Sequence, residues 1–125
     1  MFNSAGSIWL AMMALVLILV LIGMSMDPYG AVILVSATIA EIAYQNGINA
    51  IHFWVVVMVA FELGYLSPPV ALNHLLTRQV VGEEELRAAI DEGTSFWSRN
   101  ERLILPVVVM GVALILVAFV PLCFY

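Results

Sequence analysis

Gly64-Tyr65-Leu66-Ser67-Pro68-Pro69 interrupts an apolar stretch that begins at Asn49 and runs to about Val81. As one helix, this stretch would be roughly 50 Å long at 1.5 Å per residue. The hydrocarbon core of a bilayer is only about 30 Å thick. Each proline removes a backbone donor and clashes with the preceding turn. The motif therefore predicts a discontinuous transmembrane helix over residues 49–81, with an unwound joint at membrane depth.

The composition of the whole chain predicts an integral membrane protein. Of its 125 residues, 64% are hydrophobic and 10% are charged, whereas soluble domains carry about 25% charged residues. Ten of the thirteen charged residues (four basic plus nine acidic) fall between Arg78 and Arg102, so most of the charged groups belong to one connecting segment. No basic patch favours a nucleic-acid partner. The single Cys123 excludes an internal disulfide.

Two apolar runs before the broken helix predict a helical hairpin over residues 8–45. They are Ile8–Met24 and Tyr29–Tyr44, and Pro28 between them disfavours helix at Asp27 while suiting the first turn of a new helix. Each arm has 16–17 residues, or about 25 Å, which is at the lower limit for a full span. A re-entrant hairpin and two full crossings are equally compatible with this length.

The turn after the hairpin has a clear signature. Gln45-Asn46-Gly47 is typical of a helix C-cap followed by a turn. Asn49 then stands where an N-cap residue is expected.

An interfacial amphipathic helix is predicted over residues 82–97. Three glutamates, Glu83–Glu85, stand in its first turn, where the helix dipole favours negative charge. Phe96 and Trp97 extend its apolar side, with Trp97 at headgroup level.

The last apolar stretch, residues 103–124, is long enough to cross the membrane once as a C-terminal transmembrane helix. Pro106 would be tolerated in its first turn. All four arginines flank the segment between this stretch and the broken helix, so the positive-inside rule puts that segment in the cytoplasm. The C-terminus and the turn at residues 45–49 then lie outside.

The break itself is a candidate ion site. Irregular backbone survives in lipid only when it is buried in protein or lines a polar cavity, and freed carbonyls at such breaks coordinate cations in secondary transporters. Gly64, Ser67 and the carbonyls of residues 68–70 are the natural ligands. A simple proline kink explains the same sequence equally well.

Several other polar residues are candidates, each with a plainer alternative. Glu62 is an intramembrane carboxylate and hence a functional candidate, although a structural acid held by hydrogen bonds is slightly favoured. Asp27 is at the hairpin tip, which lies either at membrane depth or at the surface. Asn73 could face a substrate path, whereas His74 is favoured as a packing residue. No zinc site or catalytic pair is indicated, so an enzyme is not predicted.

Three motifs together are characteristic of one family. They are Gly23-Met24 followed by Asp27-Pro28, Gly47-Ile48-Asn49-Ala50-Ile51-His52-Phe53, and Glu62-Leu63-Gly64-Tyr65-Leu66-Ser67-Pro68-Pro69-Val70-Ala71-Leu72-Asn73. The chain, from about residue 21 to 124, resembles the C-terminal part of the large membrane subunit of TRAP (tripartite ATP-independent periplasmic) transporters.

The resemblance implies an elevator-type, sodium-coupled importer of organic acids, such as C4-dicarboxylates or sugar acids. It makes the first two runs a re-entrant hairpin and places sodium between the hairpin tip and the break. The implied sodium ligands are Gly23, Gly64, Ser67 and Val70, with Ser67 where threonine is usual. The substrate-path candidates are Asp27, Glu62, Pro68, Pro69 and Asn73. No cofactor is implied beyond the coupling ion.

The resemblance also has a consequence for length. The family's large subunit has two inverted repeats, and this chain has one hairpin and one broken helix. We therefore expect a single membrane domain that is a C-terminal fragment or split product, in the bacterial inner membrane with a periplasmic C-terminus. The implied partners are the remainder of the large subunit, a small membrane subunit, a periplasmic substrate-binding protein and the lipid bilayer. The alternative is a small non-transporting membrane subunit that assembles with a partner protein.

Overall fold

The computed structural model describes residues 2–67, 72–82, 84, 85, 87, 88 and 96–124. Every regular element within these ranges is a helix, which confirms the all-α prediction. The elements are α1 (Phe2–Ser25), α2 (Pro28–Ala37), α3 (Ile39–Gln45), α4 (Ala50–Leu66), α5 (Leu72–Val81), α7 (Phe96–Phe119) and the 3₁₀ helix η1 (Pro121–Cys123). Two stretches in the described part, Gly6–Ser25 and Ile104–Cys123, are long and apolar enough to cross a membrane.

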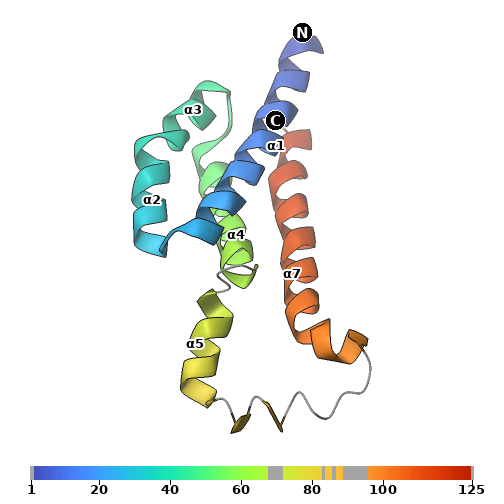
Figure 1. Cartoon of the computed structure of the whole chain (residues 1–125). Coiled ribbons are helices and arrows are strands. Elements are labelled where there is room, and N and C mark those ends of the chain that lie inside the picture. The colour runs from blue at the N-terminus through green and yellow to red at the C-terminus, as the bar shows by residue number, and fades with distance from the viewer. Residues whose placement is uncertain (1, 68–71, 83, 86, 89–95, 125) are drawn as a thin grey trace.

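Helix α4 is the centre of the bundle. It packs against α1 on one side and α7 on the other, as Figure 1 shows. Its buried residues recur every three or four positions, as expected for a helix with a wide contact face. They are His52, Phe53, Val56, Val57, Ala60, Phe61 and Gly64.

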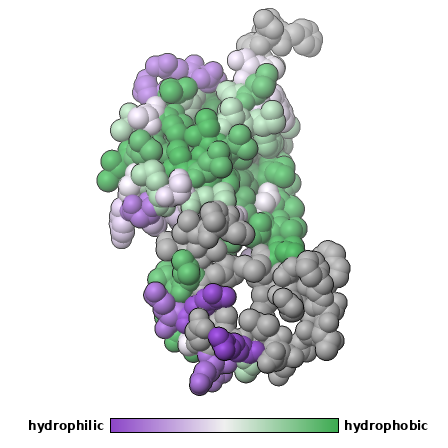
Figure 2. All heavy atoms as spheres, viewed as in Figure 1, coloured by the Kyte–Doolittle hydropathy of each residue, from purple (hydrophilic) through white to green (hydrophobic). Residues whose placement is uncertain are grey.

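The outer surface of the bundle is apolar. Large hydrophobic side chains of α1 and α7 are exposed, among them Leu10, Leu17, Val109 and Leu116. In Figure 2, hydrophobic residues form a broad belt across the bundle, and hydrophilic residues gather above it at the end of the hairpin near α3 and below it around α5. Water does not favour so large a contiguous apolar surface, which fits a lipid-facing bundle.

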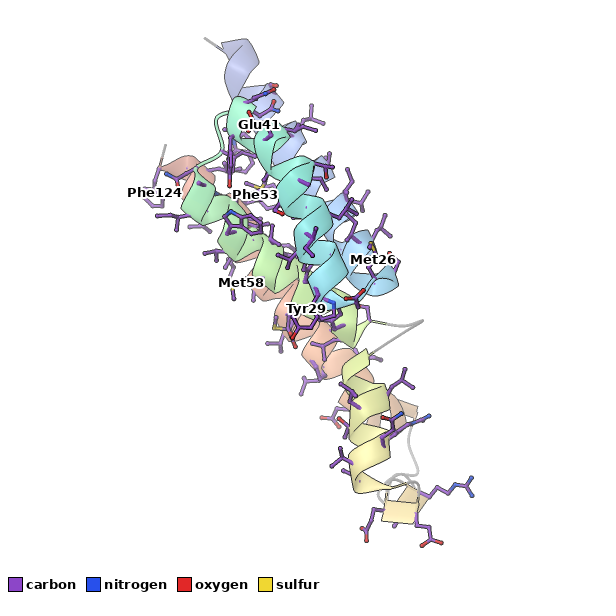
Figure 3. All side chains as sticks on the ribbon, turned by 90° about the vertical axis from the view of Figure 1, so that its left-hand side faces the viewer. Met26, Tyr29, Glu41, Phe53, Met58 and Phe124 are labelled. Atoms are coloured by element: carbon purple, nitrogen blue, oxygen red, sulfur yellow. The ribbon has the colours of Figure 1, made fainter. Side chains whose placement is uncertain are left out.

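The hairpin turn forms as its sequence predicts. Asp27 is the N-cap of α2, and its carboxylate accepts a hydrogen bond from the Gly30 N–H at 3.1 Å. Pro28 occupies the first helical turn, where its missing N–H is harmless. The tip lies beside the lower end of α4, whereas α5 continues beyond it (Figure 1). Figure 3 places Met26 and Tyr29 at this tip and Glu41 at the opposite end of the hairpin.

The turn that joins the hairpin to α4 also matches its prediction. Helix α3 ends at Gln45, and Gly47 adopts a φ of 82°, a conformation that favours glycine. Asn49 caps α4 by accepting from the Ile51 N–H at 2.9 Å.

The returning arm of the hairpin differs from the prediction of one helix over Tyr29–Tyr44. It is divided at Thr38, whose φ of −128° and ψ of −62° lie outside the helical range. The Thr38 hydroxyl donates to the Leu34 carbonyl at 2.6 Å. A hydroxyl that bonds the preceding turn competes with the helical ladder and bends the chain.

The last long helix begins earlier than predicted. Helix α7 starts at Phe96, so Phe96 and Trp97 belong to it and not to the predicted interfacial helix. Pro106 therefore lies inside α7 and not in a first turn. The lower end of α7 turns away from the axis of the rest (Figure 1), as expected where proline removes a ladder hydrogen bond. Of the predicted interfacial helix, residues 84, 85, 87 and 88 are helical, and 89–95 lie outside the described residues.

A second proline explains a buried histidine. Pro121 has no N–H to donate to the carbonyl of Val117, four residues earlier. The His52 Nε2 lies 2.8 Å from that carbonyl oxygen, and since a carbonyl only accepts, this nitrogen carries the hydrogen. His52 of α4 thus replaces a donor missing from α7.

Candidate functional site

The hairpin tip and the end of α4 meet through two glycines. A Cβ atom on Gly64 would lie 2.7 Å from the carbonyl carbon of Gly23 and 2.9 Å from its Cα. In the opposite direction, a Cβ atom on Gly23 would lie 3.0 Å from the Cα of Phe61. Real Cβ atoms do not approach backbone this closely, so only glycine allows α1 and α4 to meet here.

A small cavity lies next to this glycine contact. Its volume is about 170 Å³. Its walls come from the end of α1, the turn that follows it and the last turn of α4. The lining residues are Gly23, Met24, Ser25, Met26, Asp27, Gly64 and Tyr65.

The electrostatics of this cavity favour positive charge. The C-terminal ends of α1 and α4 both lie at it, and the carbonyls of a last helical turn have no N–H partners within their helix. Each such end carries a partial negative charge. The Asp27 carboxylate adds a full negative charge, and no lysine or arginine stands among the lining residues. Oxygen-rich, negative surroundings of this kind suit a hard cation.

Two hydroxyl groups near the cavity are hydrogen-bonded to backbone carbonyls, and a third is not. The Ser67 hydroxyl donates to the Leu63 carbonyl at 2.7 Å, and the Ser25 hydroxyl donates to the Leu21 carbonyl at 2.9 Å. The Tyr65 hydroxyl oxygen is buried and has no hydrogen-bond partner among the described residues. An unpaired buried hydroxyl costs about 1–3 kcal/mol. Ser25 and Tyr65 are not among the site residues predicted from the sequence, where their only signal is a polar group within an apolar helix.

The structure brings together three of the predicted site residues, namely Gly23, Gly64 and Asp27. Ser67 directly follows α4, in an extended conformation with φ −86° and ψ 138°. Glu62 is exposed and does not line the cavity.

The remaining predicted residues are only partly placed. Asn73 belongs to the first turn of α5. Pro68, Pro69 and Val70 lie outside the described residues.

Two other observations bound the chemistry. Within the described ranges, no group of three or more His, Cys, Asp or Glu side chains is placed to hold a metal ion. A larger, open hollow of about 710 Å³ lies at the other end of α4, beside His52 and Val117. Its walls are mainly apolar and no set of charged groups converges there, so the small cavity is the better candidate site.

A lipid-facing helical bundle in which a hairpin tip meets the end of a broken helix defines a membrane protein of the discontinuous-helix class. Residues 1–123 match the family model of the tripartite ATP-independent periplasmic transporter, DctM component. The chain belongs to this family of membrane permeases.

Curated relatives agree with this assignment. The C4-dicarboxylate TRAP transporter large permease protein DctM of Pseudomonas aeruginosa is 30% identical over 74 residues, which are 59% of this chain and 17% of that protein. The same-named protein of Vibrio cholerae is 38% identical over 64 residues, 51% of this chain and 14% of that protein.

A more distant relative carries a different substrate in its name. The isethionate TRAP transporter permease protein DctMQ of Oleidesulfovibrio alaskensis is 23% identical over 105 residues, 83% of this chain and 15% of that protein. The chain thus aligns with between 14% and 17% of the length of these relatives. No solved structure matches it.

Proposed function

We propose that this chain is part of a sodium-coupled secondary transporter that imports organic acids with a periplasmic substrate-binding protein. The observation that carries the proposal is the meeting of two helix C-termini at the Gly23–Gly64 contact, beside a cavity that Asp27 also lines. Family membership supports a transporter over a small non-transporting subunit. The partners would be the rest of the large subunit, the small membrane subunit and the periplasmic protein.

Sodium would be held by oxygen ligands in and next to the cavity. Backbone oxygens from the end of α1 and the end of α4, together with the Ser67 hydroxyl and Val70 beyond it, would surround the ion. Sodium would offset the repulsion between the two negative helix ends. Its binding would therefore favour the seated position of the hairpin tip, in which Gly23 contacts Gly64 at the end of α4.

The coupling of organic-acid import to sodium binding would follow from this preference. A ligand shifts a conformational equilibrium only through its different affinities for the two states. If sodium binds better when the tip is seated, sodium stabilises the closed transporter around its organic acid. The chain would lie in the bacterial inner membrane, with α5 toward the cytoplasm and the C-terminus in the periplasm.

The substitution Ser67→Ala tests this site. In a transporter complex that contains this segment, it should weaken sodium activation of uptake roughly ten- to hundredfold, because a bond to a charged group contributes about 1.5–3 kcal/mol. The measurement is radiolabelled substrate uptake into proteoliposomes across a series of sodium concentrations.

The matched control is Ser36→Ala. Ser36 also donates its hydroxyl to a backbone carbonyl, that of Ile33 at 2.9 Å, but it lies on α2 away from the cavity. This control should leave the sodium dependence unchanged. Equal sodium dependence in Ser67→Ala and the native protein would refute the assignment of Ser67.

A further inference from the structure

Tyr65 is the residue of the cavity that the sodium site described above leaves unexplained. It belongs to the last turn of α4, and it is one of the residues that line the cavity, with Gly23 and Asp27. Its ring lies against that of Phe61, with centroids 6.4 Å apart. Its hydroxyl oxygen is buried without a hydrogen-bond partner in the described part of the chain. Native structures seldom leave such a group unpaired, so an absent partner is indicated.

The surroundings restrict what that partner is. The Asp27 and Glu62 carboxylates both lie within electrostatic range of the Tyr65 hydroxyl, and the C-terminal ends of α1 and α4 at the cavity are negative as well. An anionic substrate group would be repelled by these charges. A cation would be attracted, and a neutral phenol oxygen could donate a lone pair to it.

We propose that the Tyr65 hydroxyl is a side-chain ligand of the cation that this cavity holds. This assignment rests on the sodium site proposed above and adds to it a ligand from α4 that the sequence motifs did not indicate. The same cavity borders the hairpin tip, through Gly23 and Asp27. Tyr65 would thereby connect ion binding to the position of the tip.

Asp27 is less suited to be the direct ligand. Its carboxylate already accepts from the Gly30 N–H and caps α2. Binding a cation directly would compete with this cap. A neutral oxygen from Tyr65 adds a ligand while Asp27 keeps its structural role and contributes charge from a distance.

The substitution Tyr65→Phe tests the assignment because it removes only the hydroxyl. Thermal unfolding of the native chain and of the variant in lipid nanodiscs would be measured across sodium concentrations, with potassium and choline chloride as ionic-strength controls. We expect the apparent sodium affinity to fall about tenfold, which corresponds to about 1.4 kcal/mol. Without sodium, the variant should be at least as stable as the native chain, because the buried hydroxyl that it lacks had no hydrogen-bond partner.

Tyr44→Phe is the matched control. The Tyr44 hydroxyl accepts from the Trp54 indole N–H at 2.9 Å, on residues that do not line the cavity. This change should leave the sodium affinity unaltered. If Tyr65→Phe also kept native sodium affinity while the native chain responded to sodium, the Tyr65 assignment alone would be overturned. If the native chain gave no sodium-specific response, the proposed site would fail and this inference with it.

Discussion

Gly64→Ala is expected to produce the largest functional loss of any single methyl addition in the described chain. The new Cβ would lie 2.7 Å from the carbonyl carbon of Gly23, and both partners are backbone, so no side chain can move aside. Overpacking of this kind costs about 1–3 kcal/mol. If the tip must be seated to bind sodium, apparent sodium affinity falls roughly ten- to hundredfold. Sodium-dependent thermal unfolding and uptake by a complex containing the segment would measure the effect.

Gly111→Ala is the matched control for this experiment. Gly111 lies within α7, and a Cβ added there meets nothing within 4 Å. Helix propensity alone favours alanine over glycine in both helices, so a difference between the two variants isolates the contact with Gly23. Native sodium affinity in Gly64→Ala would show that the close contact between α1 and α4 is dispensable.

His52→Leu is expected to cause the largest loss of stability. It leaves the Val117 carbonyl without the donor that His52 Nε2 supplies at 2.8 Å. An unsatisfied buried carbonyl costs about 1–3 kcal/mol, and hydrogen bonds between membrane helices measure about 0.6–1.7 kcal/mol. We therefore expect a loss of about 1–2 kcal/mol, measured by denaturant titration in detergent micelles.

A second substitution makes this result specific. Pro121→Ala would return an N–H to the position four residues after Val117. In the His52→Leu background, it should recover most of the lost stability, whereas in the native background it should change little. The two substitutions would then show strong coupling in a double-mutant cycle. Strictly additive effects would contradict the explanation that His52 compensates for Pro121.

The parts of the fold that were predictable are those with local chemical signals. Asp27 and Pro28 specify the start of α2, Asn49 specifies the start of α4, and Gly47 permits the turn between them. Each signal acts within a few residues, through a missing donor, a side-chain cap or a permitted φ. Such features can be inferred without knowledge of the tertiary structure.

The features that were not predicted depend on competing local interactions or on contacts between residues far apart in the sequence. Thr38 lies within a mainly apolar run, and the sequence does not reveal its non-helical φ and ψ or its hydroxyl bond to Leu34. Phe96 and Trp97 continue into α7 although their pattern also suited an interfacial helix. The unpaired hydroxyl of Tyr65 is evident only once α1 and α4 are assembled.

The candidate site was predictable only in part. Gly23 and Gly64 are far apart in sequence, and no local rule connects them. The family motifs indicated that both belong to one site, and the structure adds the backbone contact between them. That contact explains physically why both positions carry glycine.

The division at Thr38 has a consequence for how the protein enters the membrane. Helix α2 has 10 residues and α3 has 7, so they measure about 15 Å and 10 Å. Each is far shorter than the roughly 20 residues that a helix needs to span the membrane on its own. Helix α1, with 24 residues, has no such difficulty. During biosynthesis, α2 and α3 would therefore have to leave the translocon together with α1, as one insertion unit.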